Sequence, residues 1–215
     1  MKRFLSLFVA VMAVASLSCE LQAQDLRWGA TGGVNFAWTH MSKTTSSDCY
    51  LGFQLGAKAE YDMAQYITDG FYLDARLLYT LKGGQWAGGH DNLGYLELPV
   101  NFAYRHDIGG DVKLFGGVGP YLALGVLGKN VKKIDGAKVK SDTFGTLYNR
   151  FDLGLNYNIG VEMWDVWQFF IGFEHGLLNS LKNEGITPDG GVDNSNYQKP
   201  RMRPLNFYIG TAFMF

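Results

Sequence analysis

The sequence is poor in cysteine and proline, carries almost no net charge, and has no hydrophobic run long enough for a comfortable transmembrane helix. Its 215 residues include 2 Cys and 5 Pro, with a formal charge of −1. The absence of a basic field argues against a nucleic-acid partner. With 15% aromatic and 18% charged residues, the chain is also unlike a disordered protein. Any crossing of a membrane by the mature chain would therefore use strands.

The first two dozen residues have the anatomy of a secretory signal peptide. Two basic residues precede an apolar run over 4–17, and a small residue stands just before the expected cleavage site. We predict that residues 1–23 are removed and that 24–215 form a single β-barrel domain. Removal would leave Cys49 as the single cysteine, so no internal disulfide is expected.

Most of the mature chain alternates with a period of two, which is typical of strands with two unlike faces. Over 150–163 the odd positions are apolar, beginning at Phe151, and the even positions are polar or small. Segment 51–62 alternates in the same way. Six further predicted strands cover 26–38, 70–82, 93–106, 112–127, 167–178 and 204–215.

The connections between these segments alternate in length. The short ones are 63–69, 107–111 and 164–166, whereas the long ones are 39–49, 83–92, 128–146 and 179–203. Long loops at one end and tight turns at the other are typical of outer-membrane barrels. We therefore predict an all-β fold, an eight-stranded antiparallel up-and-down transmembrane β-barrel. It would be a multi-pass protein of the bacterial outer membrane with both mature termini in the periplasm.

The direction in which the polar face points, into the lumen or outward, indicates which solvent surrounds such a barrel. In a membrane barrel that face lines the lumen, and at eight strands side chains fill the lumen. A soluble lipocalin-like barrel, whose polar face meets water, is the alternative. Aromatic residues near both strand ends, including Tyr95 and Tyr148 at the loop end, favour two lipid–water interfaces. The predicted lumen charge network comprises Lys58, Glu60, Asp74, Arg76, Glu97, Arg105, Arg150, Asp152, Glu162 and Glu174.

Three motifs and the last strand resemble the outer-membrane β-barrel family common in Bacteroidota, which includes PorT-like proteins. The motifs are Tyr-Leu-Glu-Leu-Pro at 95–99, Gly-Val-Gly-Pro-Tyr at 117–121 and Arg-Phe-Asp-Leu-Gly-Leu at 150–155. The resemblance implies a barrel in the outer membrane. Through its PorT-like members it also implies assistance to protein secretion.

The chain end resembles the C-terminal assembly signal of bacterial outer-membrane proteins. Such a signal has a polar or tyrosine residue, a glycine two residues later, and aromatic residues at the third-last and last positions. This resemblance implies recognition by the barrel assembly machinery during biogenesis. The matching residues are Tyr208, Gly210, Phe213 and Phe215.

The sequence offers little support for catalysis, a metal or another cofactor. Its histidines lack H-E-x-x-H spacing, and paired cysteines are absent, so no metal site is predicted. His40, Ser42, Asp48 and His90 lie in or beside long loops and would form a catalytic set if they met, but any exposed loops offer such a set by chance. We predict that the protein is not an enzyme.

The predicted function is to present extracellular loops to a partner or surface ligand on a rigid scaffold. The expected partners are outer-membrane lipid and lipopolysaccharide, together with an envelope protein. Loop 128–146 carries five lysines against two aspartates. Contact with lipopolysaccharide phosphates and simple solvation of this loop are both open. A narrow porin-like pore is the alternative function, against which a crowded lumen argues.

Overall fold

The computed structural model describes residues 26–41, 47–86, 89–134, 137–144, 148–180 and 202–215. The predicted signal peptide over 1–23 lies outside these residues. Nine strands are present within them, and no helix there is long and apolar enough to cross a membrane. The strands are β1 (Leu26–Met41), β2 (Tyr50–Asp62), β3 (Phe71–Trp86), β4 (Gly89–Gly109), β5 (Val112–Ile134), β6 (Ala137–Asp142), β7 (Phe151–Met163), β8 (Trp167–Gly176) and β9 (Met202–Met214).

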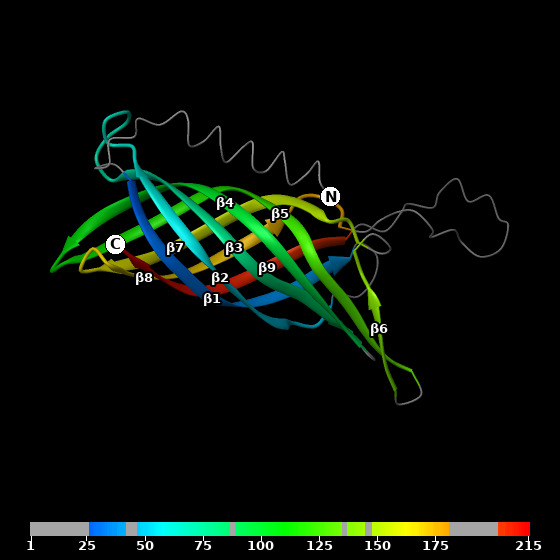
Figure 1. Cartoon of the computed structure of the whole chain (residues 1–215). Helices are drawn as coiled ribbons and strands as arrows, with labels where there is room; N and C mark the ends of the chain where they lie inside the picture. Colours follow the sequence, from blue (N-terminus) through cyan, green and yellow to red (C-terminus); the bar gives the residue numbers. More distant parts are fainter. Residues whose placement is uncertain (1–25, 42–46, 87–88, 135–136, 145–147, 181–201) are drawn as a thin grey trace.

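Eight of these strands close into an antiparallel barrel. They follow the order β4-β3-β2-β1-β9-β8-β7-β5, and pairing of β4 with β5 completes the circle. The remaining strand, β6, pairs only with the far end of β5 and extends past the barrel (Figure 1). The predicted fold class is therefore confirmed. We call the end that carries Leu26 of β1, Met214 of β9 and the short connections the turn end, and the opposite end the loop end.

The turn end has the tight connections that the sequence predicts. Gly109, Gly110 and Asp111 have positive φ between β4 and β5, while Trp164 and Asp165 have φ of 55° and 59° between β7 and β8. Two successive positive φ values are typical of the hairpin turns whose twist matches that of the flanking strands.

The loop end differs from the prediction at two of its long connections. The predicted loop over 83–92 is a continued hairpin, in which pairing runs as far as Trp86 with Gly89. Much of the predicted loop over 128–146 is likewise paired, with Lys129–Ile134 of β5 against Ala137–Asp142 of β6. The physical reason is that alternation requires two unlike solvents. Beyond the hydrocarbon the outer face of a hairpin meets water in place of lipid, so that pattern is lost.

The barrel is apolar outside and polar inside. On β7, Tyr157 and Ile159 are 41% and 61% exposed, whereas Asn156 and Glu162 are fully buried. Large apolar side chains face outward on every barrel strand, so the surface is one that hydrocarbon can cover. This arrangement excludes the lipocalin-like alternative.

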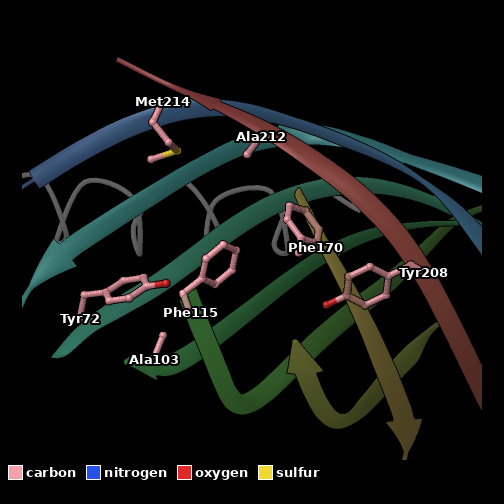
Figure 2. Close-up of a cluster of buried hydrophobic side chains, with 7 residues drawn as sticks. All are labelled: Tyr72, Ala103, Phe115, Phe170, Tyr208, Ala212 and Met214. Atoms are coloured by element: carbon pink, nitrogen blue, oxygen red, sulfur yellow. The ribbon is translucent and has the colours of Figure 1, made fainter. Parts of the chain in front are cut away.

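Inside the barrel, aromatic side chains share the lumen with the polar groups. Figure 2 shows one cluster reaching into the enclosed space, including Phe115 from β5, Phe170 from β8 and Tyr208 from β9. A second cluster nearer the loop end contains Tyr95 and Tyr148, each 5% exposed. Their placement in an outer aromatic band is therefore wrong, because Tyr95 shares the inward face of β4 with Glu97.

Candidate functional site

The lumen contains three levels of paired charges, of which the first lies near the turn end. Arg105 Nη2 lies 2.5 Å from Glu60 Oε2 and 3.1 Å from Glu162 Oε2. Arg27 Nη1 approaches the same two carboxylates at 3.2 and 3.4 Å. Gln168 donates to both of them, at 2.8 and 2.5 Å. Five side chains from five different strands are thus joined across the barrel.

The middle level is centred on Arg76, whose side chain is fully buried. Its Nη2 donates to Asn156 Oδ1 at 3.0 Å and to Tyr208 Oη at 3.3 Å. Its Nε lies 3.7 Å from Asp74 Oδ2, and its guanidinium sits 5.5 Å from the centre of the Phe170 ring. The cation is therefore stabilised by a carboxylate, polar acceptors and an aromatic face together.

The third level, nearer the loop end, has one cation among three carboxylates. Lys82 Nζ lies 2.5 Å from Glu97 Oε2 and 2.6 Å from Glu174 Oε2. The ammonium also lies 5.0 Å from the Tyr121 ring centre, and Tyr121 donates to Asp152 at 2.8 Å. Because Glu97 and Glu174 are almost completely buried, Lys82 is their principal source of neutralisation.

Above this level, buried side chains close the loop end of the lumen. Phe144 packs edge-on against Tyr95, with ring centres 5.5 Å apart. Tyr148 donates to Asp91 Oδ2 at 2.8 Å, and Asn130 donates to the other oxygen of Asp91. A cavity of about 20 Å³ remains here, while a separate hollow of about 320 Å³ opens at the turn end. Their linings share no residue, and the Arg76 level lies between them.

Most of the predicted network residues meet in this lumen, but Arg150 does not. It is exposed and precedes the first residue of β7, so its assignment to the lumen is wrong. The charged lumen residues that the sequence prediction omits are chiefly Arg27 and Lys82. Lys82 stands in phase with Asp74 and Arg76 on β3, and this signal could have identified it.

The other predicted sites fall in different places. Tyr208 and Gly210 of the C-terminal motif face the lumen, whereas Phe213 and Phe215 lie outside and are 41% and 77% exposed. Of the loop set, Asp48 is exposed and Ser42 lies outside the described residues. Among the residues that the structure describes, no group of three or more His, Cys, Asp or Glu side chains is arranged to hold a metal ion.

A salt bridge outside the membrane-spanning segments ties two turn-end connections together. Lys113, at the start of β5, donates to the carboxylate of Asp165 in the β7–β8 turn. This hydrogen bond lowers the pKa of Asp165 below its ordinary value, overcoming a smaller desolvation effect that raises it. Because the folded-state pKa is lowered, ionised Asp165 stabilises the fold at pH values above the ordinary pKa of a carboxyl group. That contribution is lost as the pH falls through the lowered value.

Replacing Lys113 with glutamine is therefore expected to raise the pKa of Asp165 back towards its ordinary value, because the charged donor is lost. The measurement is an NMR titration of the Asp165 carboxyl carbon in detergent micelles. Lys129→Gln, a change at the opposite end of the barrel, is the control and is expected to leave the curve in place. An unchanged titration in Lys113→Gln would contradict the assignment of the shift to this pair.

The closed strand order, outward apolar faces and paired polar lumen define a membrane β-barrel of eight strands. A family model described as the outer membrane protein beta-barrel domain matches residues 4–199, and the chain belongs to this family. Membership places the protein in the bacterial outer membrane. A search of curated proteins finds no match.

Similar solved structures include several outer-membrane proteins. Ail, the attachment invasion locus protein of Yersinia pestis, is 13% identical with a TM-score of 0.45, covering 89% of this chain and 99% of its own. Neisserial surface protein A is 14% identical with a TM-score of 0.47, covering 87% and 97%. The outer membrane enzyme PagL is 15% identical with a TM-score of 0.44, covering 84% and 97%.

Proposed function

We propose that the protein is a non-enzymatic scaffold that presents its loop-end segments outside the cell to a partner or surface ligand. Both mature termini then lie in the periplasm. The observation that carries this proposal is the contrast between a filled lumen and a loop end built out by the β3–β4 and β5–β6 hairpins. The buried titratable side chains are engaged with one another, which supports a structural rather than catalytic use of the lumen.

Other parts of the proposal concern biogenesis and partners. Residues 1–23 serve as an export signal, and the motif from Tyr208 to Phe215 is read by the barrel assembly machinery. An envelope protein bound at the loop end would allow the protein to assist secretion, as the resemblance to PorT-like proteins implies. Each of these roles uses the barrel as a rigid support.

The proposed orientation is tested by an epitope placed at either end of the barrel. An epitope inserted between Asp135 and Gly136 is expected to bind antibody on intact cells, because it follows the loop-end strand β5. An epitope inserted between Gly109 and Gly110 is the matched control and is expected to bind only after the outer membrane is permeabilised. The reverse pattern would show that the loop end faces the periplasm.

The narrow pore is the competing function, and conductance distinguishes it. The purified protein in a planar bilayer is expected to give no resolvable unitary current, because Arg76, Phe170 and Tyr208 fill the middle of the lumen. A general porin inserted in the same bilayer is the positive control. Reproducible single-channel steps from the wild-type protein would support the pore and contradict the filled lumen.

A further inference from the structure

The turn-end hollow, of about 320 Å³, is lined by the β2–β3 connection, the end of β4 and the start of β5. Arg105 N donates to Gly70 O at 2.8 Å, which holds the connection against β4. Gly70 has a φ of 87°, and a Cβ atom there would lie 2.4 Å from Arg105 O, so this close approach requires glycine. The volume is that of a small-ligand site, for which about 300–1,000 Å³ is usual.

The lining carries three exposed aspartates, whereas its two permanently charged cations are already paired. Arg105 is bonded to Glu60 and Glu162, and Lys113 is bonded to Asp165. Within the described chain, none of the three aspartates forms a salt bridge. The hollow therefore has an excess of negative charge that a bound cation would neutralise. The aspartates are Asp62, Asp69 and Asp107.

The hydrogen bonds of these aspartates leave carboxylate oxygens available to a ligand. Asp62 Oδ1 accepts from Ala64 N, and Asp107 Oδ1 accepts from Gly109 N, each at 2.7 Å. Their Oδ2 atoms, and both oxygens of Asp69, have no hydrogen bond within the described ranges. By strand alternation, Asp62 and Asp107 fall on the lumen-facing side of β2 and β4. These oxygens therefore stand at the aqueous mouth of the barrel.

Aromatic rings form the remaining wall of the turn-end hollow. Tyr104 is 42% exposed and is flanked by Phe71 and His106, whose ring centres lie 4.9 and 6.4 Å from its own. Tyr72, which reaches from β3 into the enclosed space in Figure 2, is 4% exposed, and its hydroxyl has no hydrogen-bond partner among the described residues. Aromatic faces beside carboxylates suit a guanidinium, because its plane stacks on a ring while its N–H groups donate to carboxylates.

We propose that the turn-end hollow binds an arginine side chain of a partner protein. The guanidinium would lie against Tyr104 and donate to the available aspartate oxygens. An arginine is favoured over a lipid ammonium because Asp62 and Asp107 lie on the lumen side of the wall, away from the lipid. Under the orientation proposed above, on which only the compartment rests, the partner is periplasmic. The barrel would then carry a second interaction surface, opposite the loops.

The test follows the backbone amide NMR shifts of Gly70 and His106 in detergent-solubilised protein titrated with the peptide acetyl-Gly-Arg-Gly-amide. Saturable shifts are expected. The corresponding lysine peptide is expected to bind several-fold more weakly, because an ammonium lacks the planar fork. The citrulline peptide, a neutral analogue of the arginine peptide, is expected to give no saturable shift.

Variants of the lining separate the charged and aromatic contributions. D62N/D69N/D107N is expected to bind the arginine peptide about tenfold more weakly, because each exposed ion pair contributes modestly. Y104L is expected to lose about threefold through the cation–π contact. D111N removes an exposed aspartate of the same end that lies outside the lining, and this matched control is expected to bind like the wild type.

Several results would overturn the assignment. Binding of the citrulline peptide, undiminished binding by the triple asparagine variant, or an equal loss in D111N would each do so, and a lysine peptide of equal affinity would contradict a guanidinium site. Displacement of the arginine peptide by phosphatidylethanolamine but not by phosphatidylglycerol would assign the hollow to a lipid ammonium and contradict a protein partner. The detergent measurement does not depend on orientation, so its failure is distinguishable from a failure of the epitope experiment.

Discussion

Replacement of Lys82 with methionine is expected to destabilise the barrel by about 3–5 kcal/mol, because it leaves buried carboxylates without their cation. Lys82 Nζ contacts Glu97 and Glu174 at 2.5 and 2.6 Å, and neither carboxylate has appreciable access to water. The measurement is urea unfolding in lipid vesicles, followed by tryptophan fluorescence and by the difference in gel mobility between heated and unheated samples.

A compensated variant separates lost charge pairing from lost packing. In Lys82→Met combined with Glu97→Gln and Glu174→Gln, no unpaired charge is left at this level, so most of the stability is expected to return. A Lys82→Met protein as stable as the wild type would contradict the view that this ammonium neutralises the level. A triple variant no better than the single one would place the loss in packing instead.

Gly172→Ala is expected to destabilise the barrel by about 3 kcal/mol, near the upper end of the usual cost of overpacking. A Cβ atom on Gly172 would lie 2.1 Å from Cζ and 2.2 Å from Oη of Tyr208. The tyrosine is fully buried and bonded to Arg76 and Asn156, so it cannot move aside without breaking those contacts. Urea unfolding in the same vesicles measures the loss.

Gly116→Ala is the matched control for this substitution, since it also adds one methyl group within a strand. The new Cβ would meet nothing closer than Asn158 O at 3.5 Å, an ordinary contact. Its unfolding curve is expected to stay within about 0.5 kcal/mol of the wild type. Equal losses in the two variants would show that the cost belongs to strand glycines in general and not to the Tyr208 contact.

The sequence predicts the barrel well because the two faces of each strand meet different solvents. Over the predicted segment 150–163 this difference produces strict alternation, and the observed strand β7 begins one residue later, at Phe151, and ends at Met163. The pattern fails where the difference ends. The pairing of β5 with β6 lies beyond the apolar surface, where residues 128–134 do not alternate and 137–142 alternate only over a short stretch.

Which residues line the lumen is easier to predict from the sequence than which of them contact one another. Register places Lys58 opposite Arg76 and Glu60 opposite Asp74, which are like-charged pairs. The attractive contacts are instead diagonal or across the lumen, such as Lys58 with Asp74 and Lys82 with Glu174. These contacts depend on the tilt and stagger of the strands, which set the height of each side chain along the barrel axis. The alternation of faces along a strand does not encode that height.

Single cysteines placed along β7, from residue 151 to 162 in a Cys49→Ser background, test the inside-out arrangement most directly. A spin label at each position reports contact with oxygen dissolved in the lipid. Labels at Leu153, Tyr157 and Ile159 are expected to relax strongly with oxygen, whereas labels at Asp152, Asn156 and Glu162 are expected to be protected. The opposite phase, or exposure with a helical period, would contradict a polar lumen enclosed by a lipid-facing wall.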